Sequence, residues 1–170
     1  MSDPVQRPPL ARLLSPRSVA VVGASAEPHS VGHNILVNLA RFGFAGEVYP
    51  VSRRGGEIGG RACVASIDDL PAGIDAAVLA VPAGAVRQSL EACARRGIGG
   101  AVVFASGFAE QDEAGRRAQD EFAAVAAELG LAVIGPNCIG FVNYAGKAAL
   151  SFEPVDPPPV LEGAGICVIA

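Results

Sequence analysis

Short apolar runs alternate with amphipathic segments along most of the chain. Apolar runs of strand length occur at residues 18–22, 48–51, 76–81, 101–104 and 131–134. After the first run, apolar residues recur at helical spacing from Ile35 to Phe42, and Gly43 stands where a helix C-cap glycine belongs. Short apolar runs bounded by turn residues are typical of strands buried in a parallel sheet. The pattern therefore predicts strands and helices in alternation.

Two further helices are expected later in the chain. Pro82 is placed as a helix-starting proline and opens the first of them. The second and longer one covers residues 112–129. We also expect a short strand within the Gly-rich stretch 58–64 and a capped helical turn at 66–70.

Strands that alternate with helices at this interval predict an α/β fold, a Rossmann-like, doubly wound parallel sheet. Ligands of such sheets bind beyond the carboxyl ends of the strands. This rule predicts a binding site formed by the segments that follow the strands, at residues 23–32, 52–56, 81–84, 105–108 and 135–141.

The chain divides into three parts. Residues 1–17 contain Pro and Arg and are expected to form an irregular N-terminal arm with one short turn around residues 10–14. Residues 18–150 form the α/β domain. Residues 151–170 begin as a Pro-rich linker and end in a strand-like run, so we expect the start of a truncated next domain there.

Composition argues against several classes of function. Hydrophobic residues make up 51% of the chain and the net charge is −4, which indicates a large core and disfavours general nucleic-acid binding. No apolar stretch is long enough for a membrane span, and the N-terminus shows no export signal. Cys63, Cys93, Cys138 and Cys167 lack C-x-x-C spacing, so we expect no zinc site and a reducing, cytoplasmic location.

The first strand leads into a candidate phosphate loop. Gly23 permits a sharp turn, and the small residues Ala24 and Ser25 let backbone N–H groups approach an anion near the N-terminus of the next helix. The loop is not G-x-G-x-x-G, because Ser25 replaces the second glycine and Gly32 comes too late. A βα turn without a ligand is the alternative.

The second strand ends in Arg53 and Arg54, where an NAD-binding fold usually places an acidic residue. Guanidinium groups suit an additional phosphate on the ribose. NADP carries this phosphate at the 2′ position and coenzyme A carries it at the 3′ position. The alternative is that both arginines are solvated surface residues.

Several ordered motifs then identify a family. They lie at residues 14–25, 38–44, 46–51, 106–110 and 135–140. With these motifs, the chain from about residue 10 to 170 resembles ADP-forming (NDP-forming) acyl-CoA synthetases. More distantly, it resembles the CoA-binding domain of the succinyl-CoA synthetase α subunit.

The resemblance implies coenzyme A (CoA) as the ligand and assigns roles to the loops. The first loop would hold the phosphates, Arg53 the nucleotide, the 104–107 segment the pantetheine, and Asn137 would lie near the thioester. The implied CoA-contacting residues are Gly23, Ala24, Ser25, Arg53, Val81, Pro82, Phe104, Ala105, Ser106, Gly107 and Asn137. Related chains often have an acidic residue in place of Ser106.

The same resemblance implies that the chain is not catalytic on its own. The phosphorylated histidine and the ATP-grasp domain of the family belong to further domains, in cis or in another subunit. We interpret the two histidines beside the phosphate loop as capping or solvent-facing and Cys138 as a buried thiol, not a nucleophile. Glu110, Asp112 and Glu113 are interpreted as acids that favour a helix macrodipole.

The leading hypothesis is therefore a CoA-binding domain of an ADP-forming acid–CoA ligase, which binds CoA or acyl-CoA. One alternative is a regulatory CoA-binding domain of a synthetase-like protein acetyltransferase. Another is an NADP-binding Rossmann domain, although the loop lacks G-x-G-x-x-G.

Overall fold

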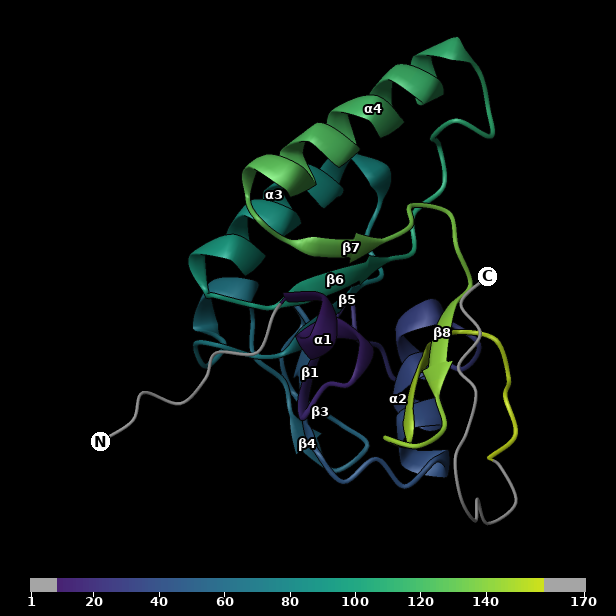
Figure 1. Ribbon diagram of the computed structural model, residues 1–170. Coiled ribbons are helices and arrows are strands. Elements are labelled where there is room, and N and C mark those ends of the chain that lie inside the picture. Colours follow the sequence, from purple (N-terminus) through teal and green to yellow (C-terminus); the bar gives the residue numbers. More distant parts are fainter. Residues whose placement is uncertain (1–8, 158–170) are drawn as a thin grey trace.

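A parallel sheet forms the centre of the molecule (Figure 1). The computed structural model describes residues 9–157. The sheet has five strands in the order β2-β1-β5-β6-β7. Their bounds are Ser18–Val22 (β1), Glu47–Val51 (β2), Ala76–Leu79 (β5), Gly100–Val103 (β6) and Ala132–Ile134 (β7). The predicted strands are confirmed, with ends that shift by one or two residues.

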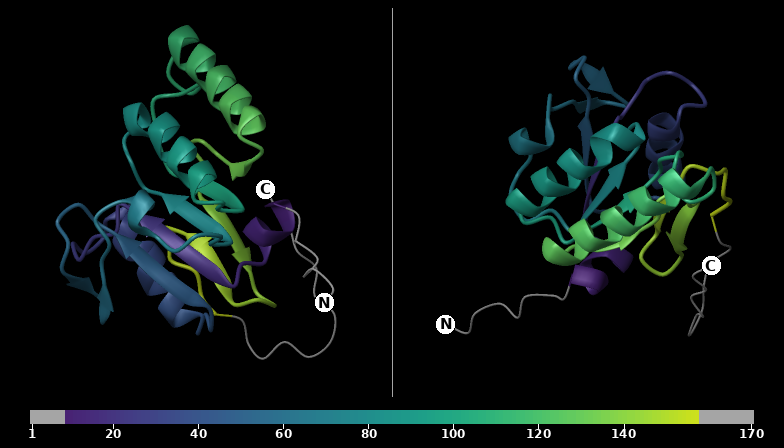
Figure 2. Two further views of the ribbon diagram at one scale, coloured as in Figure 1. Left: turned by 90° about the vertical axis from the view of Figure 1, so that its left-hand side faces the viewer. Right: turned by 90° about the horizontal axis from the view of Figure 1, so that it is seen from above.

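Helices cover both faces of the sheet, which confirms the predicted Rossmann-like, doubly wound class. α3 (Ala83–Arg95) and α4 (Glu113–Glu128) lie side by side on one face of the sheet (Figure 2). A single turn of 3₁₀ helix, η1 (Ile67–Asp69), packs on the same face. α1 (Pro9–Leu14) and α2 (Val31–Arg41) pack on the other.

The strands are apolar throughout because both of their faces are buried. In β1, Ala20 and Val22 belong to the core beneath α3 and α4, while Val19 and Val21 belong to the core beneath α2. All residues of β5 and β6 are buried. Burying one Val or Leu side chain contributes about 1.5–3 kcal/mol, so these two cores supply most of the driving force for the fold.

The helix termini follow from local sequence. Ser30 caps α2 by accepting a hydrogen bond from the N–H of His33, so this helix begins several residues before its first regularly spaced apolar positions. Gly43, with φ of 65°, ends α2 in the left-handed conformation that was expected of it. Asp112 caps α4 through the N–H of Gly115 at 2.8 Å.

One element was not predicted. The chain after β7 forms an antiparallel hairpin of β8 (Gly140–Asn143) and β9 (Ala148–Ser151), which packs on α2. The buried amide of Asn38 holds this hairpin to α2, donating to the carbonyl oxygens of Ser151 at 2.7 Å and Glu153 at 2.8 Å. β9 therefore continues one residue past the boundary expected at residue 150, and the predicted strand-like run at 165–170 lies outside the described residues.

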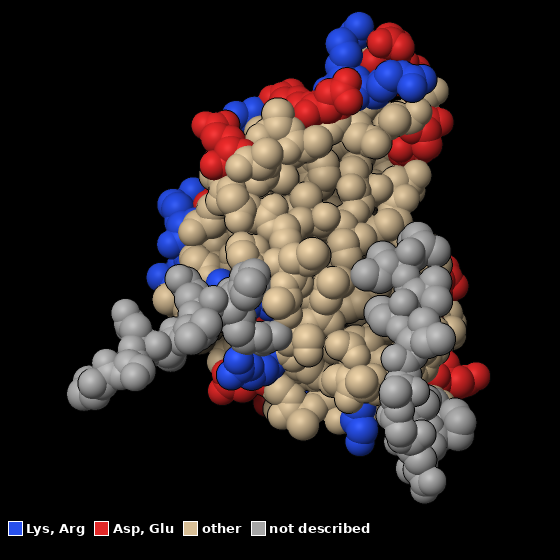
Figure 3. Space-filling model, in the orientation of Figure 1, with Lys and Arg blue, Asp and Glu red and all other residues tan. Residues whose placement is uncertain are grey.

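The two outermost strands of the sheet, β2 and β7, are covered differently. The short hairpin of β3 (Glu57–Ile58) and β4 (Arg61–Ala62) leads to Val64, which pairs with Val51 and covers part of the β2 edge. The opposite edge, at β7, faces the viewer in Figure 3, and Lys, Arg, Asp and Glu lie mostly at the periphery of this face. Within residues 9–157, none of the helices has the length and apolar character of a membrane span.

Candidate functional site

Five loops meet at the carboxyl edge of the sheet, as predicted, because all five strands run parallel. From β1 the chain crosses outward to β2 and then returns past β1 to β5. The loops after β1 and β5 therefore leave in opposite directions, which opens the crevice where ligands of doubly wound sheets bind. With strands about 4.8 Å apart, the edge from β2 to β7 extends over about 19 Å.

The loop after β1 is held against its neighbours by its backbone. Gly23 has φ of 84°, and a Cβ there would lie 2.2 Å from the carbonyl oxygen of Ala80. The N–H groups of Gly23 and Ala24 both donate to the carbonyl oxygen of Val51 at 3.1 Å. In the described part of the chain, the N–H groups of Ser25 and Ala26 form no hydrogen bond, so they are among the donors available to an anion.

Gly32 joins the candidate site, although the motif spacing in the sequence did not include it. It is the second residue of α2, and a Cβ there would lie 2.1 Å from the carbonyl oxygen of Gly23. The absence of a side chain brings the N-terminus of α2 against the loop after β1, so that its positive end faces the crevice. The third glycine of G-x-G-x-x-G has this role, and here the longer loop moves it further along the chain.

The loop after β2 carries the positive charge. Arg53 and Arg54 occupy the two central positions of a turn that the N–H of Gly55 closes onto the carbonyl oxygen of Ser52 at 2.9 Å. Both side chains are exposed, and neither forms an ion pair with any residue between 9 and 157. Two guanidinium groups are thus available to an anionic ligand.

The loops after β5 and β6 present mainly backbone. Val81 is half-buried in the core, and exposed Pro82 immediately precedes α3. Phe104 is 9% exposed and packs edge-on against Phe152, with ring centroids 5.1 Å apart. The ring of Phe104 is therefore part of the core, and this residue can offer a ligand only its main chain.

Beyond Phe104, the loop after β6 becomes accessible. Ala105 is 7% exposed, whereas Ser106 is exposed and Gly107 is half-exposed with φ of 102°. Of the predicted pantetheine segment, Ser106 and Gly107 are the residues that a ligand can reach most directly.

The loop after β7 folds over the end of β6. The N–H of Asn137 donates to the carbonyl oxygen of Ala105 at 3.1 Å, and the Asn137 side chain is exposed. A Cβ on Gly135 would lie 2.5 Å from the carbonyl oxygen of Val103, so only glycine fits there. The thiol of Cys138 lies 3.6 Å from the same oxygen, and burial raises its pKa, which argues against a thiolate nucleophile.

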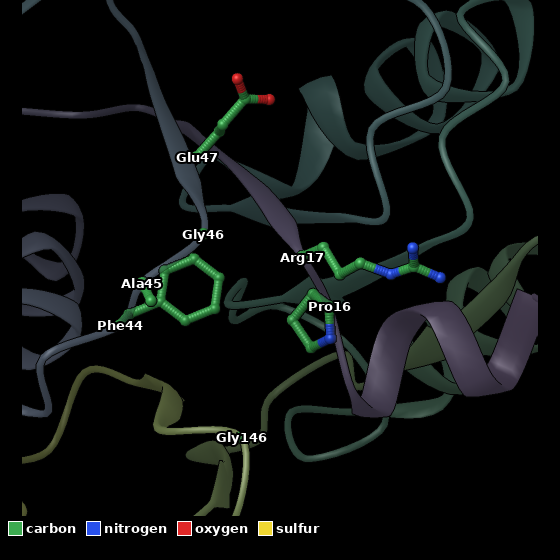
Figure 4. Close-up of a pocket in the computed structure, with 7 residues that line it drawn as sticks. All are labelled: Pro16, Arg17, Phe44, Ala45, Gly46, Glu47 and Gly146. Atoms are coloured by element: carbon green, nitrogen blue, oxygen red, sulfur yellow. The ribbon is translucent and has the colours of Figure 1, made fainter.

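Two cavities were found, one that borders this row of loops and one that lies away from it. One, of about 310 Å³, lies between α3 and α4 and reaches Gly107 and Phe108. The other, of about 470 Å³, lies at the opposite, amino edge beside the start of β1 and β2 (Figure 4). The charged side chains of Arg17 and Glu47 extend away from each other there, so they do not converge on one ligand.

No group of His, Cys, Asp and Glu side chains within residues 9–157 could hold a metal ion. His33 lies in the first turn of α2 and His29 in the exposed loop before it. The predicted site is therefore a binding surface made from glycines, backbone donors and two arginines. Its layout suits an elongated ligand with an anionic end near β2.

Sequence comparison identifies relatives of the same kind. The chain is 40% identical over 158 residues to a trans-feruloyl-CoA synthase from an unknown prokaryotic organism, covering 91% of this chain and 22% of the synthase. It is 38% identical to the α subunit of the ADP-forming acetate–CoA ligase I of Pyrococcus furiosus, covering 88% of this chain and 33% of that subunit. The chain thus spans about a fifth to a third of these relatives.

Solved structures agree with this result. A dinucleotide-forming acetyl-coenzyme A synthetase 1 of Ca. Korarchaeum cryptofilum, in complex with phosphate and ADP, superposes with a TM-score of 0.80 at 36% identity. The match covers 85% of this chain and 31% of the synthetase. The family model described as "CoA binding domain" matches residues 17–144. The chain therefore belongs to the CoA-binding domain family, as a homologue of the N-terminal part of ADP-forming acyl-CoA synthetases.

Proposed function

We propose that this domain binds CoA or acyl-CoA along the carboxyl edge of the sheet and performs no chemistry on its own. The ligand would lie across all five loops, with its nucleotide toward β2 and its thiol toward β7. The observation that carries the proposal is the asymmetry of the edge. One end has two guanidinium groups that form no ion pair within residues 9–157, and the other end has backbone-rich loops.

The distribution of charge along the carboxyl edge supports this direction of the ligand. The 3′-phosphate of CoA would lie at Arg53 in the loop after β2, with Arg54 beside it. The pyrophosphate would lie at the loop after β1, where the N–H groups of Ser25 and Ala26 and the N-terminus of α2 favour an anion.

The uncharged pantetheine would then extend over the loops after β5, β6 and β7. It would pass Val81 and Pro82, cross Ser106 and Gly107, and bring the thiol close to Asn137. Gly107 lacks a side chain, so a ligand can approach the main chain there. The exposed amide of Asn137 would be the polar side chain nearest the thioester of an acyl-CoA.

Calorimetric titration of the domain with CoA, 3′-dephospho-CoA and NADPH tests the proposal. We expect micromolar CoA binding, weakened about tenfold by removal of the 3′-phosphate, since a charge-assisted contact is lost. The R53A variant should bind CoA about tenfold more weakly and lose its discrimination against 3′-dephospho-CoA. R117A removes an exposed charge on α4 and is the matched control.

The outcomes separate the candidate functions. Tight NADPH binding without CoA binding would favour the NADP-binding alternative, which the same two arginines support. An R53A affinity equal to the wild-type value would place the nucleotide elsewhere. No measurable binding of CoA or acyl-CoA would contradict the proposal.

We further propose that the domain supplies the CoA site of a longer ADP-forming acid–CoA ligase, with the other ligase domains in cis or in a partner subunit. The length of the relatives supports this view. The free thiols of Cys63, Cys93 and Cys138 support a reducing, cytoplasmic location. Sequencing the flanking gene region distinguishes a ligase, with a histidine-bearing domain, from an acetyltransferase fusion.

A further inference from the structure

The carboxylate of Glu110 closes the loop after β6. One of its oxygens accepts hydrogen bonds from the N–H groups of Gly107 at 2.6 Å and Phe108 at 3.1 Å, and its other oxygen accepts from Phe108 at 3.1 Å. These bonds, first among them that from Gly107, lower the pKa of the Glu110 carboxyl. Glu110 therefore serves as an acceptor for two main-chain donors in this loop.

This role differs from the one expected from sequence, which was to favour the macrodipole of α4. The helix begins at Glu113 and is capped by Asp112. Its N-terminus is thus capped without Glu110, and the Glu110 carboxylate bonds instead to the loop before the helix.

The other side of the loop is fixed by main chain. The N–H of Asn137 holds the carbonyl oxygen of Ala105, and Gly115 of α4 packs so closely that a Cβ would lie 2.0 Å from the carbonyl oxygen of Phe108. The ring of Phe108 is buried and packs against Phe122, with centroids 6.1 Å apart. Between these anchors, Glu110 is the side chain that sets the direction of the Gly107 and Phe108 N–H groups.

Glu110 also contributes to the charge asymmetry of the edge. It puts a carboxylate beside the loop where the neutral pantetheine would lie, about three strand spacings, or roughly 14 Å, from the loop after β2. A phosphate at this position would be repelled, whereas an amide would not. The carboxylate thus disfavours a reversed ligand.

We propose that Glu110 is a positioning residue for the pantetheine half of CoA, an inference that rests on the proposed CoA-binding function. It holds Gly107 in its positive-φ conformation and turns the N–H groups of Gly107 and Phe108 away from the ligand. The loop then presents Ser106 and the bare Cα of Gly107 to the pantetheine chain. Glu110 itself does not touch the ligand.

Titration of the E110A and E110Q variants tests this role. We expect E110A to bind CoA about tenfold more weakly, because the loop loses the acceptor of two hydrogen bonds and becomes mobile. E110Q keeps one acceptor oxygen and should recover affinity to within about threefold of wild type. Adenosine 3′,5′-bisphosphate, which lacks pantetheine, should bind all three proteins equally.

The last ligand separates positioning from general loss of structure, since a misfolded domain would bind both ligands poorly. E113A is the matched control, because this exposed glutamate lies three residues further on and pairs with Arg116 at 3.5 Å. Wild-type CoA affinity in E110A, or equal losses for CoA and the bisphosphate, would overturn the proposal. Stronger CoA binding by E110A would also overturn it, because the carboxylate would then block the N–H groups that the ligand uses. If wild type does not bind CoA at all, the proposed function fails instead.

Discussion

The amino edge and the carboxyl edge of the sheet, where the strands begin and end, are built in different ways. At the amino edge, the side chain of Arg12 ties α1 to two segments. Its Nε donates to Asp75 at 3.0 Å, and its Nη2 donates to the carbonyl oxygens of Gly73, Ile74 and Gly97 at 2.7–3.0 Å. At the carboxyl edge, the loops are joined by main-chain hydrogen bonds and glycine contacts, and the arginines form no ion pairs among the described residues.

The difference indicates a division of labour. The Arg12 and Asp75 side chains are 13% and 14% exposed, so this ion pair at the amino edge holds segments of the fold together and is not open to a ligand. At the carboxyl edge, Glu110 is the charged side chain that holds a loop in place, and the other loops are held by main-chain contacts. Arg53 and Arg54 therefore remain available to a ligand. Variants at the amino edge should therefore affect stability alone, and variants at the carboxyl edge should affect ligand binding.

The largest effect is expected for R12A. It removes the guanidinium from a mostly buried Asp75 carboxylate and the Arg12 donor from the carbonyl oxygens of Gly73 and Gly97, whereas the carbonyl oxygen of Ile74 keeps the N–H of Gly99. The free energy of unfolding should fall by about 3 kcal/mol, as is usual when one partner of a buried ion pair is removed. Urea denaturation followed by circular dichroism measures this change.

CoA affinity of folded R12A should remain at the wild-type value, because Arg12 lies at the opposite edge of the sheet. R12K is an informative companion variant, since it keeps the charge but cannot bridge several oxygens with a planar fork. A large loss of CoA affinity in folded R12A would contradict the division between the edges.

The next effect concerns two glycines at equivalent helix positions. Gly32 and Gly84 are each the second residue of a helix, but a Cβ at Gly32 would lie 2.1 Å from the carbonyl oxygen of Gly23, whereas a Cβ at Gly84 would meet nothing within 4 Å. G32A should lose about 2 kcal/mol of stability through overpacking. It should also bind CoA about tenfold more weakly, because α2 moves away from the loop after β1.

G84A is the control and should be neutral or more stable by up to about 1 kcal/mol, since alanine favours a helix over glycine. Thermal denaturation and CoA titration of both variants give the comparison. If G32A bound CoA as wild type does, the close approach of α2 would have only a structural role.

The fold could be predicted from the sequence because its signals are local. Each buried strand is a continuous apolar run, and glycine or proline marks several of the strand and helix ends. The β8–β9 hairpin was missed because it is held in place by a distant residue, Asn38. A contact between residues more than a hundred positions apart leaves no periodic pattern in the sequence.

The site could be predicted only in part, for the same physical reason. Parallel strands bring their following loops to one edge, so the positions of Gly23, Arg53 and Asn137 on that edge followed from topology. The role of Glu110 could not be derived in this way. A glutamate that accepts hydrogen bonds from its own loop and a glutamate that favours a helix N-terminus occur in the same kind of local sequence. Gly32 was set aside because a fixed motif spacing assumes a fixed loop length.

The smallest expected effect is on thiol reactivity, and it tests the ligand end of the carboxyl edge. Cys138 is half-buried in the loop after β7, and burial raises its pKa, while fully buried Cys93 in α3 has its pKa raised to about 12. At pH 8, iodoacetamide should therefore modify Cys138 slowly and Cys93 hardly at all, as peptide mass spectrometry would show. Saturating CoA should slow Cys138 modification by about threefold, since a bound pantetheine would restrict access to that loop. An unchanged rate in the presence of bound CoA would mean that the thiol end of the ligand does not reach the loop after β7. The carboxyl edge would then bind only the nucleotide half of CoA.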